Sequence, residues 1–454
     1  MSFAHRNDVM SETHIRPLLP DPGAPQTLEQ AGLSKDLMLQ LVLKTLHFAG
    51  ELSGTALAER LGVSFTVVEP ALDLIKAQHQ CEIVGGALLG GASFRYRITD
   101  AGRARAALFL EQNGYVGVAP VPLAQYQEYM RLFRQATPRS ATPDRVRQAF
   151  GEMVLSNRVL DQLGPAINAS RSLFIYGPPG NGKSLMTQRI RGLLDGAIAI
   201  PHAIEIEGQI VRVFDPVLHE ELPREDTPAT GAFGTVAFEG PKYDRRWVRC
   251  RRPLVTVGGE LTLDNLDLAF SRSSGYYRAP VQVASNGGVL VIDDFGRQKC
   301  TPQELLNRWI GPLETRVDYL VLQSGQRIEM PFQVLVVFAT NIRPSELVDE
   351  AFLRRIHFKI FAESPTVTDF MRIFERYCEQ CGVAFDPALV EDLLLHYYHP
   401  RQLPLRGCHP RDIIDQALSL ADYLGQPKVL TKEVLMAACQ SYFVDDTEPL
   451  TEYA

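Results

Sequence analysis

Residues 172–194 read SLFIYGPPGNGKSLMTQRIRGLL, a stretch that predicts a buried strand, a glycine-rich turn and a helix that begins at a Lys-Ser pair. Glycines let the backbone wrap closely around an anion, and the N–H groups of such a turn point toward it together with the positive helix end. The stretch therefore predicts a phosphate-binding loop, in which Lys183 reaches the β- and γ-phosphates and Ser184 is a Mg²⁺ ligand. The expected nucleotide-binding residues are Gly177, Pro178, Pro179, Gly180, Asn181, Gly182, Lys183, Ser184 and Leu185.

Length and composition limit what the rest of the chain can be. The 454 residues predict two to four domains, and the net charge of −7 excludes a polycation that coats nucleic acid. Seven scattered cysteines are too irregular for a disulfide framework and favour a reducing, cytoplasmic location. We interpret the lone pair Cys378 and Cys381 as packing residues rather than zinc ligands. No apolar stretch approaches 18 residues, so we expect no membrane insertion.

A second apolar run, Gly288–Gly296 (GVLVIDDFG), predicts a buried strand that ends in two carboxylates. A carboxylate at the carboxyl end of a strand, beside a phosphate loop, can hold Mg²⁺ through its water shell. We assign this role to Asp293. Asp294 is then the candidate group that polarises the attacking water, and its short side chain leaves open whether hydrolysis is fast or slow.

Three further segments follow in a fixed order. Val334–Asn341 predicts another buried strand that ends in Thr-Asn, Ala351–Ile360 predicts a helix with two arginines followed by a strand, and Gly407–Ile413 opens a helix. Together with the phosphate loop and the acidic pair, these segments resemble AAA+ ATPases over roughly residues 143–445, with residues 363–445 as the helical lid.

The resemblance implies roles for specific residues. Asn341 takes the sensor 1 position, one of Arg354 and Arg355 is donated to the ATP of a neighbouring subunit, and Arg411 takes the sensor 2 position and reaches the γ-phosphate. The family commonly has Glu where this chain has Asp294. The resemblance thus implies ATP and Mg²⁺ as ligands and self-association into a ring, with a hexamer expected. Within the superfamily, Tyr319–Pro331 resembles the hairpin of the pre-sensor-1 clade, which includes MoxR-type chaperones.

Residues 34–115 resemble a winged helix-turn-helix domain, on the segments ALAERLGVS and YRITDAGRARA. Such domains commonly read DNA with the second helix of the motif. Here that helix, TVVEPALDLIKAQ, carries Glu69 and Asp73 against Lys76, whereas phosphate contact calls for Lys and Arg. DNA binding therefore competes with a protein-docking or spacer role, which we favour.

Residues 200–287 are longer than a minimal ATPase core needs, and three segments within them have alternative interpretations. The run 241–252 contains six basic residues with Tyr243 and Trp247 between them, a pattern that fits single-stranded nucleic acid, solvated strand arginines or an acidic partner. We favour the last two. Gly275–Tyr277 fits either a pore loop or a core strand, and Gly231–Ala237 weakly resembles the loop with which enhancer-binding activators engage sigma factor.

The sequence thus predicts an α/β fold with an AAA+ P-loop NTPase core, a parallel sheet, a helical lid and an N-terminal winged-helix domain. The expected segments are a flexible lead-in (1–33), the winged helix (34–115), a linker (116–142), the ATPase domain (143–362, insertion 200–287), the lid (363–445) and a tail (446–454). The expected function is ATP hydrolysis that remodels a protein client. The alternative is a DNA-associated regulator of transcription or replication, and a small-molecule kinase is disfavoured by the lid and the paired arginines.

Overall fold

The computed structural model describes residues 16–85, 90–224 and 243–443, and the chain divides into two compact units. Unit 1 comprises residues up to 140 together with 194–291 and 298–336, and unit 2 comprises 141–193, 292–297 and 337 onward. The segment Gly231–Ala237 lies outside the described residues. Within the described ranges, no helix is long and apolar enough to cross a membrane.

The phosphate loop follows a strand of a five-stranded sheet, whose strand order is β10-β13-β16-β5-β17. The strands are β10 (Leu254–Val257), β13 (Val289–Ile292), β16 (Leu335–Thr340), β5 (Leu173–Tyr176) and β17 (Phe358–Phe361). Both β16 and β17 pair with β5 in parallel. Every residue of β13 and β16 is buried, as expected of strands that are covered on both faces. The fold is a mixed α/β fold with a parallel sheet.

Unit 2 also contains the helices that precede or follow the strands of this sheet along the chain. They are α7 (Pro143–Ala149), α8 (Asn157–Ala169), α9 (Lys183–Ile190), α12 (Pro344–Leu347) and α13 (Glu350–Arg355). The rings of Phe174, Phe295 and Phe338 pack together, with centroids 5.0 to 5.7 Å apart. This aromatic cluster ties β5 and β16 to the turn after β13, the three places from which the candidate site residues come.

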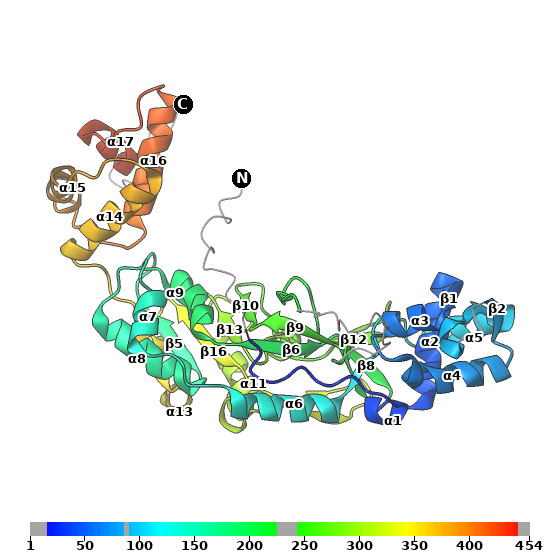
Figure 1. The fold of residues 1–454 in the computed structure, drawn as a ribbon. Helices are drawn as coiled ribbons and strands as arrows, with labels where there is room; N and C mark the ends of the chain where they lie inside the picture. The colour runs from blue at the N-terminus through cyan, green and yellow to red at the C-terminus, as the bar shows by residue number, and fades with distance from the viewer. Residues whose placement is uncertain (1–15, 86–89, 225–242, 444–454) are drawn as a thin grey trace, which may run out of the picture. The chain divides into compact units, whose positions relative to one another are not determined.

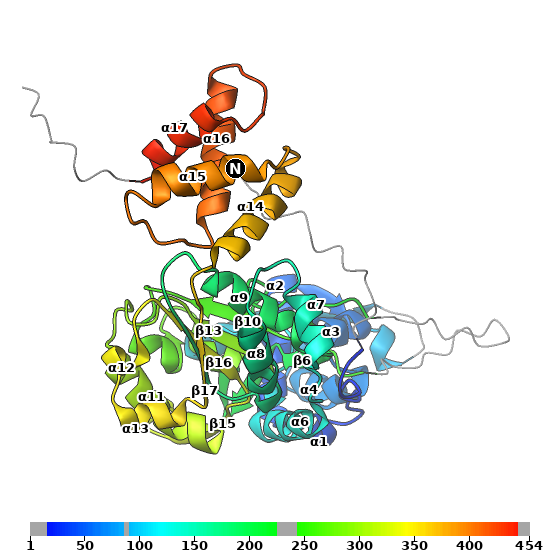
Figure 2. The ribbon, with the colours of Figure 1, turned by 90° about the vertical axis from the view of Figure 1, so that its left-hand side faces the viewer.

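The last part of unit 2 is helical (Figure 2). It contains α14 (Val367–Cys381), α15 (Pro387–Leu393), a π-helical turn (Leu394–Tyr398), α16 (His409–Tyr423) and α17 (Lys432–Tyr442). These elements share a core that includes Phe370, Phe374 and Ile413. Cys378 belongs to the same core and is fully buried, which agrees with the packing role expected for it. Among the described residues, no group of His, Cys, Asp or Glu side chains could hold a metal ion by itself.

In unit 1, four helices gather around a three-stranded sheet of order β1-β3-β2 (Figure 1). The elements are α2 (Lys35–Ala49), β1 (Glu51–Ser53), α3 (Gly54–Leu61), α4 (Phe65–Ala77), β2 (Cys81–Gly85), β3 (Arg95–Ile98) and α5 (Asp100–Gln112). Ser34, Ser53 and Thr99 each cap a helix by accepting a backbone N–H, so local sequence signals fix three of the helix starts. The helix expected at TVVEPALDLIKAQ is α4.

The remainder of unit 1 is mostly β-structure. A sheet of order β11-β12-β8-β7-β4 and the pairs β6-β9 and β14-β15 make up this part, together with α6, α10 and α11. The strands are β4 (Val121–Pro122), β6 (Ala197–Pro201), β7 (Ala203–Ile206), β8 (Gln209–Arg212), β9 (Trp247–Arg251), β11 (Ala269–Ser271), β12 (Tyr276–Arg278), β14 (Val317–Val321) and β15 (Arg327–Pro331), and the helices are α6 (Leu123–Ala136), α10 (Val281–Ala284) and α11 (Pro302–Thr315). The hairpin expected at Tyr319–Pro331 is the pair β14-β15.

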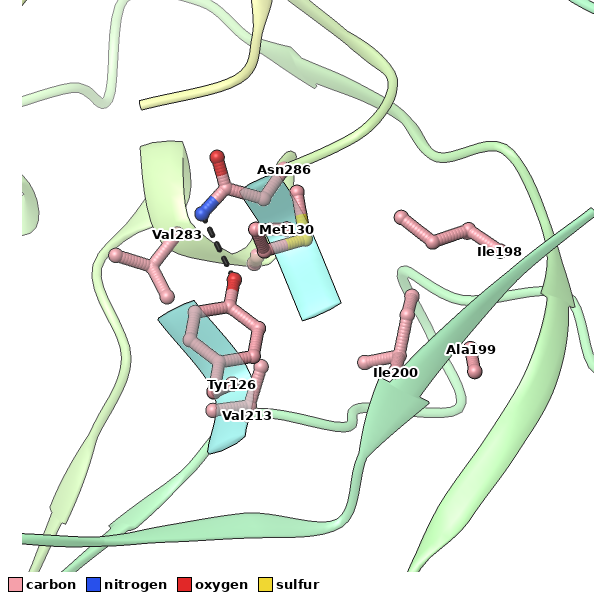
Figure 3. Close-up of a pocket in the computed structure, with 9 residues that line it drawn as sticks. Tyr126, Met130, Ile198, Ala199, Ile200, Val213, Val283 and Asn286 are labelled. Carbon is pink, nitrogen blue, oxygen red and sulfur yellow. Dashed lines mark hydrogen bonds between the residues drawn. The ribbon is translucent and has the colours of Figure 1, made fainter. Parts of the chain in front are cut away.

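The structure of residues 116–142 differs from the linker that we expected. Its helix α6 has 14 residues and buries Tyr126, Tyr129, Met130 and Phe133 in the core of unit 1. The Tyr126 hydroxyl accepts a hydrogen bond of 2.8 Å from the Asn286 amide (Figure 3). A cavity of about 10 Å³ adjoins this pair, room for about one water molecule. The prolines at both ends suggested a linker, but the apolar face of the helix makes it part of the core.

The expected flexible lead-in also differs in residues 16–33. Leu18 and Leu19 pack against the unit 1 core, and a short helix, α1 (Leu28–Ala31), ends in the fully buried Ala31. The Asp21 carboxylate is bonded to Arg249 at 2.6 Å and lies 3.6 Å from Arg224. Proline and polar content suggested flexibility, whereas these contacts across the chain hold the segment in place.

The described part of the basic run 241–252 contains arginines that are buried. Arg246 is 1% exposed and Arg252 is 5% exposed. The Arg252 Nε atom donates to the Gly287 carbonyl, and burial lowers the pKa of Arg252 to about 10. The Trp247 ring lies 4.8 Å from the Tyr129 ring in the core. The nucleic-acid interpretation of this run is thus wrong for Arg246, Trp247 and Arg252, because these side chains face the protein interior. The favoured alternatives, solvated arginines or an acidic partner, are wrong for Arg246 and Arg252 for the same reason, and residues 241 and 242 lie outside the described residues.

The structure also contradicts the pore-loop alternative for Gly275–Tyr277. Tyr277 is buried in β12, and its hydroxyl accepts the backbone N–H of Gln323 at 2.9 Å. Tyr276 packs edge-on against Tyr115, with ring centroids 5.6 Å apart. The core-strand alternative is therefore correct for both tyrosines.

We predict that Asp244→Ala destabilises unit 1 by roughly 3–5 kcal/mol, because it leaves the buried Arg246 guanidinium without its carboxylate. Arg246 also donates to the carbonyls of Ala31 and Pro120, so it cannot turn to solvent without breaking those bonds. Chemical unfolding followed by the fluorescence of the neighbouring Trp247 measures the effect as a lower midpoint. The control is Arg245→Ala, which removes an exposed guanidinium next in sequence and should leave the midpoint unchanged. Equal midpoints for the two variants would contradict the prediction.

Candidate functional site

The ammonium group of Lys183 joins the phosphate loop to the end of the neighbouring strand β16. Its Nζ atom donates to the carbonyls of Gly177 and Pro178, each at 2.9 Å, and to Oδ1 of Asn341. Lys183 is 8% exposed. Burial lowers the pKa of Lys183, and the carboxylates of Asp294 and Asp293 oppose that effect. The Lys183 ammonium therefore lies in a buried site that has two carboxylates nearby.

Ser184 and Asp293 meet beside this lysine. The Ser184 hydroxyl, at the first turn of α9, donates to Oδ2 of Asp293 at 2.9 Å. Asp293 directly follows β13, so the strand end places its carboxylate next to the phosphate loop. A hydroxyl and a carboxylate oxygen that converge in this way fit Mg²⁺, which prefers oxygen ligands. Protein Mg²⁺ sites usually contain only one or two carboxylates, and phosphates and waters supply the other ligands. Both metal-ligating residues expected from the sequence are thus brought together.

Asp294 and Asn341 form the second polar pair. The Asn341 amide lies 3.5 Å from Oδ1 of Asp294 and donates to it. Asp294 has φ of +49°, a left-handed conformation that few residues other than glycine adopt. The turn holds it there, since the Phe295 N–H donates to the Ala339 carbonyl at 2.7 Å and the Thr340 hydroxyl donates to the Phe295 carbonyl at 2.7 Å. Strained backbone of this kind gathers at functional sites, because it aims one side chain at a fixed point.

The loop glycines are required by close approach and by backbone conformation. Gly177, Gly180 and Gly182 all have positive φ. A Cβ atom on Gly177 would lie 2.4 Å from the carbonyl oxygen of Ala362, and one on Gly180 would lie 2.5 Å from the Cys408 sulfur. Pro179 and Leu185 are exposed.

Asn181 connects the tip of the loop to two segments beyond the sheet. Its amide nitrogen lies 3.3 Å from the Ser364 hydroxyl and 3.4 Å from the Ala362 carbonyl, and its Oδ1 atom accepts the Gly407 N–H at 3.3 Å. The side chain is 8% exposed. The contacts of Asn181 therefore hold the tip of the loop, and the glycine pattern of the loop does not predict them.

Arg354 and Arg355 lie on α13, in its last turn. Arg354 is exposed and pairs with Glu350 at 2.8 Å, one helical turn earlier. Asp349 caps the start of the helix by accepting the Phe352 N–H. The backbone carbonyl of Arg355 accepts the Ser172 hydroxyl at 3.0 Å, which links the helix end to the start of β5. The Arg354 guanidinium is thus paired on its own helix, and the Arg355 carbonyl is bonded to the residue that precedes β5.

Arg411 also lies outside the polar cluster. It is located in the first turn of α16, and its Nε and Nη2 atoms both lie 2.8 Å from Oδ1 of Asp412. The Tyr442 hydroxyl donates to the other oxygen of the same carboxylate at 3.0 Å. Hydrogen bonding to Asp412 raises the pKa of Arg411. In this conformation its charge is already paired.

Arg406 is the cation that sequence reasoning missed. It is one of the groups whose charge lowers the pKa of Lys183, and its Nη1 atom donates to the Ser364 hydroxyl at 2.7 Å. No strand end or glycine pattern marks Arg406 or Ser364, and both become visible only when the chain segments around residues 180, 364 and 406 meet. Their proximity to the loop is a property of the tertiary structure.

Comparisons with known proteins found similarities over parts of the chain. Residues 366–441, which span α14 to α17, match the family model of a domain of unknown function, DUF8689. No curated protein sequence matches the chain. The RuvB Holliday junction branch migration motor of Thermotoga maritima is 14% identical with a TM-score of 0.36, over 64% of this chain and 71% of RuvB. NtrX from Brucella abortus is 14% identical with a TM-score of 0.38, over 64% of this chain and 56% of NtrX.

We predict that Gly177→Ala lowers the stability of unit 2 by about 1–3 kcal/mol, because the added Cβ atom meets a backbone carbonyl and the residue must keep a positive φ. Thermal unfolding followed by circular dichroism reports the change as a lower midpoint. Gly192→Ala is the matched control, since no atom lies within 4 Å of its Cβ position. The prediction is wrong if the Gly177 variant unfolds at the midpoint of the control.

Proposed function

We propose that this chain is an AAA+ ATPase that binds ATP with Mg²⁺ and uses hydrolysis to remodel a protein client within a ring. The observation that carries the proposal is the hydrogen-bonded set formed by Lys183, Asn341, Asp294, Ser184 and Asp293. These five side chains come from three separate segments and supply a cation, an amide, a hydroxyl and two carboxylates at one edge of the sheet. Phosphoryl transfer is catalysed mainly by positioning and by charge stabilisation, for which this set is suited.

The proposed division of labour follows from the contacts. Lys183 exchanges the carbonyls that it now binds for the β- and γ-phosphate oxygens, and the N–H groups of the loop bind the same anion. Ser184 and Asp293 hold Mg²⁺, which when bound neutralises phosphate charge. Asp294 accepts a proton from the attacking water, and Asn341 fixes both the carboxylate and the water through its amide. The left-handed backbone of Asp294 offsets its short side chain by directing the carboxylate into the site.

We further propose that the ATP sites lie between subunits of a ring, with a hexamer as the expected number. The support is the exposure of the Arg354 side chain, which pairs with Glu350 of its own helix, and the hydrogen bond that ties the end of that helix to the residue before β5. An arginine placed in this way is available to a neighbouring subunit, where it would meet charge that grows in the transition state. The hairpin β14-β15 supports the finer assignment to the pre-sensor-1 clade with its MoxR-type chaperones.

A protein client is favoured over DNA by the surroundings of α4. The hydroxyl of Ser64, just before α4, donates to the Pro25 carbonyl at 3.0 Å, and Thr66 donates to the Gln26 carbonyl at 2.7 Å. The chain's own lead-in thus covers the helix end that a winged helix inserts into the major groove. Lys76 on the same helix is paired with Asp73 at 2.9 Å. We therefore propose a docking or spacer role for residues 34–115, in a cytoplasmic protein whose seven cysteines are free thiols.

We predict that Lys183→Ala weakens ATP binding by about 100-fold, because the phosphates lose their buried cation. Asp294→Asn should still bind ATP while its turnover falls by about 10²–10⁴-fold, since an amide accepts no proton from water. Calorimetry measures the binding and phosphate release measures the turnover. Asp161→Asn, which alters an exposed carboxylate of α8, is the control. Normal turnover in the Asp294 variant would remove Asp294 from its role, and undiminished binding in the Lys183 variant would refute the proposed function.

We predict that mixing an Arg354→Ala/Arg355→Ala variant with a Lys183→Ala variant restores ATP hydrolysis that neither shows alone. The first variant keeps its phosphate loop and the second keeps its arginines, so a mixed ring contains interfaces with both. The measurement is phosphate release across mixing ratios at constant total protein. Activity should peak at intermediate ratios. A flat response at every ratio would show that the arginines do not act between subunits.

A further inference from the structure

A polar pocket of about 340 Å³ opens beside the start of β9 in unit 1. The lining residues come from the connection between β6 and β7, from the segment that ends at Arg224 and from the residues that lead into β9. They include His202, Arg224, Tyr243 and Arg245. Cavities that hold small ligands begin at about 300 Å³, so this pocket is large enough for a compact metabolite. Residues 225–242 lie outside the described residues and are not part of the proposed site.

The Arg224 guanidinium is fixed at the wall of the pocket. It stacks on the Tyr243 ring, 4.0 Å from the ring centroid, and its Nη2 atom donates to the Trp247 carbonyl at 2.7 Å. The Asp21 carboxylate lies 3.6 Å from the Nε atom of Arg224, but it makes a shorter contact of 2.6 Å with Arg249. One carboxylate is therefore shared by two guanidinium groups, and it neutralises only one of them.

Arg245 adds a further cation to the same pocket. Its side chain is exposed, and it has no ion-pair partner among the described residues. Glu221 is the acidic residue in the lining. The carboxylates of Glu221 and Asp21 thus face three guanidinium groups, those of Arg224, Arg245 and Arg249, which leaves the pocket with one excess positive charge. An anionic ligand would neutralise this charge.

His202 supplies a neutral polar group to the wall. Burial lowers the pKa of His202 to about 4, and the charges of Arg212 and Arg224 act in the same direction. The imidazole is therefore uncharged at neutral pH, and it has one N–H donor and one acceptor nitrogen. Its ring packs edge-on against Phe214, with centroids 5.4 Å apart, and in the described part of the chain its nitrogens have no hydrogen-bond partner. A ligand hydroxyl can therefore bond to this ring.

We propose that this pocket binds a small phosphate monoester of about the size of a phosphorylated sugar. Arg224 and Arg245 bind the phosphate, because the planar donors of guanidinium groups match phosphate oxygens, and His202 binds a hydroxyl of the ligand. A nucleic acid strand fits less well, since it needs cations along a groove, whereas Arg246 and Arg252 of the same basic run are buried. The pocket belongs to unit 1 and the phosphate loop to unit 2, so this inference does not depend on the proposed ATPase function.

The test is calorimetric titration of the full chain with ribose 5-phosphate and with ribose. Ribose 5-phosphate should bind with a dissociation constant below about 1 mM, and ribose should bind at least about 10-fold more weakly, because it lacks the charged group. Arg245→Ala should weaken the binding of ribose 5-phosphate by about 10- to 100-fold, and Arg245→Lys should recover part of the affinity. His202→Phe, which keeps a ring but has no ring nitrogen, should cause a smaller loss.

Arg131→Ala is the matched control, because Arg131 is an exposed arginine of unit 1 that pairs with Glu128 at 2.6 Å and does not line the pocket. Lys183→Ala should bind ribose 5-phosphate as the wild type does, which separates this pocket from the phosphate loop. The inference is overturned if the wild type does not bind ribose 5-phosphate, if Arg245→Ala binds it unchanged, or if Lys183→Ala abolishes the binding.

A single-stranded oligonucleotide distinguishes the remaining alternative. If it displaces ribose 5-phosphate from the wild type and loses affinity in Arg245→Ala, the pocket is part of a nucleic-acid interface and the inference is wrong. A chain that binds ribose 5-phosphate but not ATP would support this inference and refute the proposed function.

Discussion

A buried ammonium group organises the candidate site. Lys183 is nearly without solvent contact, so its three N–H donors must be satisfied by the protein or by a ligand. Two loop carbonyls and the Asn341 side chain meet this demand, and they do so only when the loop after β5 and the end of β16 lie side by side. Asn341 in turn contacts Asp294, which links the turn after β13 to the same cation. The parallel pairing of β16 with β5 supplies the required alignment.

The chemical core of the site was predictable from local sequence because each of its residues follows a buried apolar run. Val289–Ile292 and Leu335–Thr340 are mostly apolar runs typical of strands buried on both faces, and parallel strands end at one edge of their sheet. The positions of Asp293, Asp294 and Asn341 follow from that rule. The glycines of the loop likewise follow from steric need, as the contact between Gly177 and the Ala362 carbonyl shows.

What sequence reasoning missed depends on contacts between distant segments. Arg246 and Arg252 look like surface cations in a basic run, yet each lies in the interior because carbonyl oxygens from elsewhere in the chain surround it. Local charge patterns contain no information about such partners. The same holds for Arg406 and Ser364, which meet across 42 residues. The left-handed conformation of Asp294 is also invisible in the sequence, because aspartate is compatible with this region but more often adopts negative φ.

The packed lead-in has a practical consequence for anyone who trims this protein for expression. Removing everything before residue 34 would look harmless by composition, but it would take away the Asp21 carboxylate that Arg224 and Arg249 share and the Ala31 carbonyl that Arg246 binds. Three partly or fully enclosed guanidinium groups would then lose acceptors at once, and the shortened chain would be prone to precipitate. A trimmed chain should therefore begin no later than Arg16, the first of the described residues and one whose carbonyl accepts the Ala197 N–H.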